Sequence, residues 1–197
     1  MSTVADVITQ IRFETDDADG TRWEDATVLK AVIKAIKRAD NVVIKNGLEF
    51  GKASTTLTVS SGSTTTAAPS MRQDIGLFND GAEVEKLSTH DFETKEGDYW
   101  RINGANIELK EEVDEDTEYT FWYYPLTDYS SYTSVSTMPW DGKLDDFIAD
   151  YAALVLKNID EYSIEVDIQL AKDFEQSILD VYKPLTPIVQ QRKGWLS

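Results

Sequence analysis

The chain has 197 residues, and its 36 acidic and 19 basic residues give a net charge of −17 and an isoelectric point near 4.3. A surface of this sign repels phosphate backbones, which argues against a protein that grips nucleic acid. The absence of cysteine excludes disulfides, thiolate catalysis and cysteine-based zinc sites.

The length predicts one domain with a small inserted subdomain. Apolar runs stay shorter than the roughly 18 residues that a membrane span needs. The first residues, MSTVAD, lack the basic and apolar regions of a secretory signal. We therefore expect synthesis in the cytoplasm.

Two amphipathic helices are predicted at the start of the chain. Apolar residues at i, i+3, i+4 and i+7 indicate a short helix over residues 4–11, which the acidic turn 16–20 ends. A longer helix is expected up to residue 45. Thr21, three residues before Glu24, has the spacing of a capping box for this second helix.

A β segment follows. Ser and Thr fill ten of the sixteen positions 53–68, which is compatible with a strand followed by a loop or with a flexible linker over residues 53–70. Residues 74–78 and 83–87 are weaker strand candidates. The alternation in residues 99–109, with Asn-Gly in the middle, predicts a tight β-hairpin.

The hairpin leads into an acidic loop and an aromatic strand. Residues 111–118 hold six acids in eight positions, which is typical of an exposed loop. Residues 119–124 are then apolar or aromatic apart from Thr120. We expect this strand to be covered on both faces, by its own domain or by a neighbour.

Two further helices are predicted after the β segment. Broad apolar stripes indicate helices over residues 144–159 and 164–181, and Ser163 is the expected N-cap of the second. The short connection between them predicts an antiparallel pair. Pro184 and Pro187 end the last helix.

These elements predict an α+β fold. It is a four-helix bundle, with two helices before and two after an inserted small antiparallel β module, and it ends in an extended C-terminal tail. The expected boundaries are residues 1–50 and 139–183 for the helical domain, 51–138 for the inserted β module and 184–197 for a C-terminal arm.

Residues capable of catalysis or metal binding are scarce. His90 is the only histidine, and it has no evident nucleophile as a partner. The acidic turn before Gly20 fails as a calcium loop, because Thr15 and Ala26 fall where carboxylates are required. Paired carboxylates such as Asp145 and Asp146 are expected by chance among so many acids. We expect no enzyme activity, no cofactor and no metal.

Two features suggest contact surfaces. The aromatic strand, with the tryptophan of the hairpin, is expected either in the core or as an inter-subunit or tail-facing β surface; its residues are Trp100, Phe121, Trp122, Tyr123 and Tyr124. The C-terminal segment carries three cations and no acid from residue 183 onward. It is either a frayed terminus or a docking arm whose contact residues are Gln190, Arg192, Lys193, Trp195 and Leu196.

The layout resembles the head–tail adaptor proteins of tailed bacteriophages, also called head-completion proteins or tail accessory factors. The resemblance rests on DGTRWED at 19–25 opening a long helix, YWRINGANIEL at 99–109, TFWYYP at 120–125, and the segment 139–154. It spans most of the chain in order, although no single motif is sharp.

The resemblance implies a four-helix adaptor bundle with a β insertion, assembled as a homo-oligomeric, dodecameric ring beneath the portal protein. Such a ring extends the channel for double-stranded DNA and offers the tail or nozzle protein a docking surface in the virion, at the portal vertex. It also implies that the C-terminal arm contacts the portal. The acidic composition suits a channel that DNA leaves without specific binding, although solubility alone also explains it.

The alternative is a tail-associated carbohydrate-binding module that stacks sugars on exposed rings. It predicts that Trp100, Trp122 or Tyr124 lies exposed in a groove, whereas an adaptor buries these rings in the core or between subunits. An enzyme is the third possibility, and it requires two carboxylates that converge in one pocket.

Overall fold

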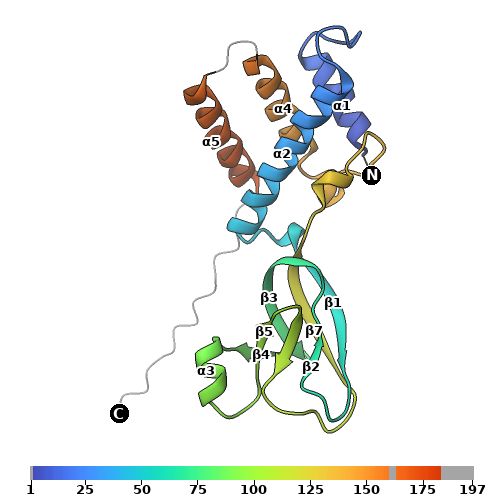
Figure 1. The fold of residues 1–197 in the computed structure, drawn as a ribbon. Coiled ribbons are helices and arrows are strands. Elements are labelled where there is room, and N and C mark those ends of the chain that lie inside the picture. Colours follow the sequence, from blue (N-terminus) through green and yellow to red (C-terminus); the bar gives the residue numbers. More distant parts are fainter. Residues whose placement is uncertain (1, 160–162, 183–197) are drawn as a thin grey trace. The chain divides into compact units, whose positions relative to one another are not determined.

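The computed structural model describes residues 2–159 and 163–182, which divide into two compact units (Figure 1). The helical unit is formed by Met1–Gly51 and Tyr129–Ser197, and the β unit by Lys52–Asp128. The chain therefore returns from the β unit to the helical unit at Tyr129, and not near residue 139 as predicted. The reason is local: the carbonyls of Ser134 and Ser136 accept the first backbone amides of the N-terminal helix.

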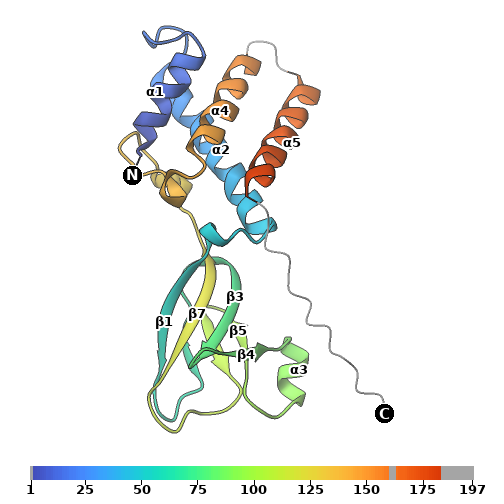
Figure 2. The same cartoon turned by 180° about the vertical axis from the view of Figure 1, so that it is seen from behind.

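The helical unit contains four long helices, seen from two sides in Figures 1 and 2. They are α1 (Val4–Glu14), α2 (Asp25–Lys45), α4 (Asp145–Ile159) and α5 (Ile164–Val181), with the short 3₁₀ segments η1 (Glu49–Gly51), η2 (Tyr129–Ser131) and η3 (Pro139–Gly142). These helices confirm the ranges predicted from apolar periodicity. In the described part of the chain, no helix is long and apolar enough to cross a membrane.

The central helix of this unit is α4, which packs against α1, α2 and α5. Its buried residues surround most of the helix: Ile148, Ala149, Tyr151, Ala152, Ala153, Val155 and Leu156. A helix that is apolar on so many sides must be covered on several sides. In both views α1 and α5 flank α2 and α4 on opposite sides.

The helix caps differ from the expected ones. The capping box belongs to α1, where Thr3 accepts from the amide of Asp6, whose carboxylate accepts from the amide of Thr3. At α2 the N-cap is Glu24, whose side chain makes no capping bond. The predicted Thr21–Glu24 capping box is therefore wrong. Ser163 caps α5 as predicted.

The β unit is a seven-stranded sheet in the order β1-β7-β3-β4-β5-β6-β2. Its two end strands, β1 and β2, lie close together, so the sheet nearly closes into a barrel. The elements are β1 (Ala53–Val59), β2 (Thr65–Ala67), β3 (Met71–Asn79), β4 (Ala82–Lys86), α3 (Thr89–Thr94), β5 (Tyr99–Asn103), β6 (Asn106–Leu109) and β7 (Thr117–Pro125).

The predicted fold class is therefore wrong. Instead of a four-helix bundle with a small antiparallel insertion, the described chain has five helices and a large, nearly closed sheet. The Ser/Thr-rich segment 53–68 supplies two strands, because its Leu57 and Val59 pack on the core. Ser88 caps the short helix α3, which connects the parallel pair β4 and β5.

The core of the β unit is one cluster whose buried members are Val59, Leu77, Val84, Trp100, Ile107, Leu109, Tyr119 and Phe121. The β5–β6 hairpin is confirmed, with Asn103 paired to Asn106 and Gly104 in the turn at φ +60°. The longest strand pairings involve β7, which lies between β1 and β3. The two units each have an apolar core of their own.

Candidate interaction surfaces

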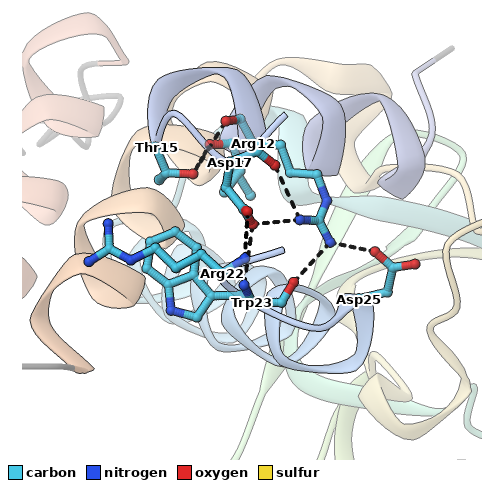
Figure 3. Close-up of polar contacts among 7 residues, drawn as sticks. Arg12, Thr15, Asp17, Arg22, Trp23 and Asp25 are labelled. Atoms are coloured by element: carbon cyan, nitrogen blue, oxygen red, sulfur yellow. Dashed lines mark hydrogen bonds and ion pairs between the residues drawn. The ribbon is translucent and has the colours of Figure 1, made fainter. Parts of the chain in front are cut away.

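The turn that joins α1 to α2 is organised around the carboxylate of Asp17 (Figure 3). Its Oδ1 accepts from the backbone N–H of Arg22 at 2.8 Å, and its Oδ2 accepts from Nη1 of Arg12 at 2.7 Å. The backbone N–H of Trp23 donates to Oδ2 at 3.3 Å. Nη2 of Arg12 then donates to the Trp23 carbonyl at 3.2 Å and to Oδ1 of Asp25 at 2.5 Å.

This network gives the acidic turn a defined shape. The side chain of Asp17 is 1% exposed, so it is a structural group and not a solvated turn residue. Gly20 has φ +65°, and a Cβ there would lie 3.1 Å from Nη1 of Arg12, so glycine is needed at this position. Directly before the turn, Phe13 is 81% exposed.

The network predicts how stability depends on pH. The backbone hydrogen bond from Arg22, assisted by Trp23 and the Arg12 charge, lowers the pKa of Asp17 below its ordinary value of 3.8. The carboxylate therefore stabilises the fold above about pH 4, and this contribution is lost as the pH falls through the lowered pKa. Asp17→Asn should destabilise the protein near neutral pH, with a difference from wild type that shrinks in acid.

Thermal unfolding by circular dichroism at several pH values measures this effect. Asp19→Asn is the matched control, because Asp19 is an exposed acid of the same turn. A D17N protein with wild-type stability at neutral pH would show that the network does not hold the turn.

A groove between α2 and α5 carries four basic side chains. It is lined by Lys34, Lys37, Arg38, Asn41, Val42, Lys45 and Glu175. The two helices are bridged by ion pairs, Lys34 to Asp167 at 2.9 Å and Lys45 to Glu175 at 2.7 Å. Such exposed pairs contribute little to stability, about 0–1 kcal/mol each. The groove therefore keeps a basic lining that can bind an acidic partner.

Next to α5, a second and mostly apolar groove runs along the seam with α4. Phe147, Leu154, Leu170 and Phe174 line it, together with Asp150, Tyr151, Asp173 and Ser177. The rings of Tyr151 and Phe174 lie 4.6 Å apart between centroids, and they hold the two helices together. This seam is therefore mainly packing within the unit.

The aromatic residues predicted as a β surface are divided between the core and the surface. Trp100 is 1% exposed and donates from Nε1 to the carbonyl of Val84 at 2.9 Å, and Phe121 packs edge-on against it. Tyr124 is buried as well. The chain itself does not cover both faces of β7, because Trp122 is 38% exposed, and coverage of that face by a neighbour stays a prediction.

The surface part of that prediction therefore rests on two residues. Tyr123 is half-buried and stacks on Phe121 with 5.6 Å between ring centroids, so only part of its ring remains accessible. Trp122 is the larger exposed group. An interface role for Trp100 and Phe121 would require the core of the β unit to open. The predicted arm residues Gln190, Arg192, Lys193, Trp195 and Leu196 lie outside the described residues.

The candidate catalytic residues that the structure describes belong to different elements. His90 lies exposed on α3. Asp116 accepts from the amide of Ser61 at 2.9 Å, which anchors a loop. Within residues 2–159 and 163–182, no group of three or more His, Asp or Glu is placed to hold a metal ion.

Asp145 is a paired carboxylate with an unusual environment. The Ser2 hydroxyl donates to its Oδ2, while its Oδ1 is buried without a hydrogen-bond partner. Burial raises the pKa of Asp145, and the charge of Asp146 adds to the effect. Its position at the first turn of α4 explains why a carboxylate is tolerated there.

Sequence reasoning missed both the Asp17 network and the α2–α5 groove. The groove had a visible signal: Lys34, Lys37, Arg38 and Lys45 are spaced i, i+3, i+4 and i+11, which places them on one face of a helix. The Asp17 network had none, because its bonds join a side chain to backbone amides beyond the turn.

Comparison with protein-family models gives no match for this chain, and comparison with curated proteins gives none either.

Proposed function

We propose that this chain is a structural virion protein of a tailed bacteriophage. It acts as a head–tail adaptor that forms a ring below the portal, extends the DNA channel and provides a docking surface for the tail or nozzle protein. Its activity is assembly and not catalysis.

The observation that carries the proposal is where the adaptor-like segments fall in the fold. Residues 19–25 lead into α2, residues 99–109 form the β5–β6 hairpin, residues 120–125 lie in β7, and residues 139–154 enter and begin α4. The segments thus mark both units of the chain. Two units with separate cores suit a subunit that offers different surfaces to different neighbours.

The charge of the chain supports the same role. A channel wall rich in acids lets DNA leave without breaking phosphate–lysine contacts one by one. At −17, however, each subunit repels its own copies, with screening over about 8–10 Å at physiological salt. Ring formation is then favoured by close, complementary contacts between subunits and by the portal as a template.

Electron cryo-microscopy of the full chain mixed with portal rings tests the function. We expect a dodecameric ring of this chain on the portal, and we expect a chain that ends at Tyr182 to lose the portal because it lacks the basic arm. Unattached monomers of the full chain would contradict the adaptor role. Portal binding by the shortened chain would contradict the role of the arm alone.

The burial of aromatic rings argues against a carbohydrate-binding module. A sugar platform needs flat rings open to solvent, yet Trp100 and Tyr124 are buried. Trp122, at 38% exposure, is the remaining candidate among the three rings. We therefore do not propose sugar binding.

A further inference from the structure

The α2–α5 groove has two chemically different walls. Its α2 wall carries the cations Lys34, Lys37, Arg38 and Lys45. The α5 side of the groove is lined by Glu175, and exposed aliphatic residues of α5 lie beyond it along the same helix. Ile164 and Ile168 are 60% and 51% exposed, and with Glu175 they form an i, i+4, i+11 stripe. Because Glu175 reaches Lys45, this stripe borders α2. A fitting ligand therefore combines negative charge with a large apolar group.

The loop that follows α1 has this combination. We call residues 13–20 the Phe13 loop: it contains the exposed phenylalanine and four acids, Glu14, Asp16, Asp17 and Asp19, with no cation. Asp17 is used internally, and the other three acids remain at least partly exposed. Because the Asp17 network holds the loop in shape, little conformational entropy is lost when it binds.

The two surfaces lie on opposite sides of the helical unit. The Phe13 loop follows α1, and the groove is bordered by α5; α1 and α5 flank the central pair α2 and α4 on opposite sides (Figures 1 and 2). A contact between different surfaces of identical subunits is heterologous, so it can repeat from subunit to subunit, and it forms a ring when the rotation between subunits closes.

We propose that the α2–α5 groove of one copy binds the Phe13 loop of the next copy. In this contact Phe13 packs on Ile164 and Ile168, while the loop acids face Lys34 and Lys37. The attraction is local, so it can offset the repulsion between acidic subunits within a few ångströms of the contact. The inference specifies the subunit contact of the proposed ring, and in that respect it rests on the proposed function.

Duplex DNA is the competing occupant of a basic groove, and the structure disfavours it. Two acids, Asp167 and Glu175, pair with lysines of the groove and would face the phosphates. The aliphatic stripe of α5 offers a phosphate backbone nothing to bind. The net charge of −17 further opposes association with DNA.

Complementary charge reversal tests the contact. Lys37→Glu with Lys45→Glu reverses the groove, and Glu14→Lys with Asp19→Lys reverses the loop. We expect sedimentation equilibrium at up to about 1 mM protein to show at least roughly tenfold weaker self-association for each variant alone. An equimolar mixture of the two variants should regain association, since each now offers the complement of the other.

Two further variants complete the experiment. Phe13→Ala should weaken association to a similar degree without loss of stability, because the side chain is 81% exposed. Lys95→Glu with Lys143→Glu is the matched control: it makes the same change in net charge at exposed lysines outside the groove, and it should weaken association much less.

The outcomes separate this contact from the adaptor function. If the groove and loop variants reduce self-association no more than the control variant does, the proposed contact is wrong. That result would not contradict a ring on the portal. Wild-type protein that stays monomeric at the highest concentration also contradicts the proposed contact. Whether a ring forms on the portal is tested separately by the electron cryo-microscopy experiment. Binding of a short DNA duplex at low salt that K37E/K45E abolishes would assign the groove to nucleic acid instead.

Discussion

Trp100→Ala is expected to lower the free energy of unfolding of the β unit by about 3–5 kcal/mol, the usual cost of removing a buried tryptophan. Trp100 is 1% exposed and lies in the cluster that joins β4, β5 and β7. Its ring meets Phe121 edge-on at 5.7 Å between centroids. The substitution also removes the donor to the carbonyl of Val84, which is then left buried without that partner.

Trp122→Ala is the control for this prediction. Trp122 belongs to β7 of the same sheet but is 38% exposed, so its removal should cost less, about 1 kcal/mol. Denaturant unfolding followed by far-ultraviolet circular dichroism compares both variants without depending on tryptophan fluorescence. Equal losses for the two variants would mean that the burial pattern of the β unit is not the one described here.

Phe174→Ala should have the second large effect, a loss of about 3–5 kcal/mol in the helical unit. Helix α5 is held by few buried residues, namely Ala171, Phe174 and Ile178. The ring of Phe174 packs on Tyr151 of α4, and removing it leaves a cavity at the centre of this contact. We expect hydrogen exchange to accelerate first along α5, because a weakly held element opens locally before the whole unit does.

The same variant has a consequence for assembly. Helix α5 carries Glu175 of the groove and the exposed Ile164 and Ile168, so Phe174→Ala should weaken self-association as it disorders α5. Phe13→Ala is the matched Phe-to-Ala substitution at an exposed position, and it should lose self-association while keeping full stability. If the two variants were equally stable, the packing of α5 on α4 would not depend on Phe174.

The helices and the hairpin could be predicted because their signals are local. Apolar periodicity located α1, α2, α4 and α5, and the Asn-Gly pair located the β5–β6 turn. The Ser/Thr-rich segment 53–68 gave no such clear signal. It forms β1 and β2 because β7 and β6 supply pairing partners that lie 39 or more residues away along the chain. Threonine is compatible with both a strand and a loop, so the pairing partner determines which of the two forms.

The candidate surfaces show the same division. The spacing of the cations on one face of α2 is visible in the sequence. That this face lies beside α5 is known only from the packing of the helices. The aromatic run 121–124 predicted a strand. Which of its rings face inward depends on the register between β7 and β3, and that pairing contains two irregularities.

The sequence by itself determined the charge of the chain, the lack of cysteine chemistry, the long helices and the tight hairpin. These properties depend on composition or on neighbours within a few residues. Only the tertiary structure decided that the sheet nearly closes, that Trp100 is core while Trp122 is surface, and that Asp17 organises the loop after α1. The physical reason is that strand pairing, burial and a buried carboxylate's hydrogen bonds each depend on groups that only folding brings together.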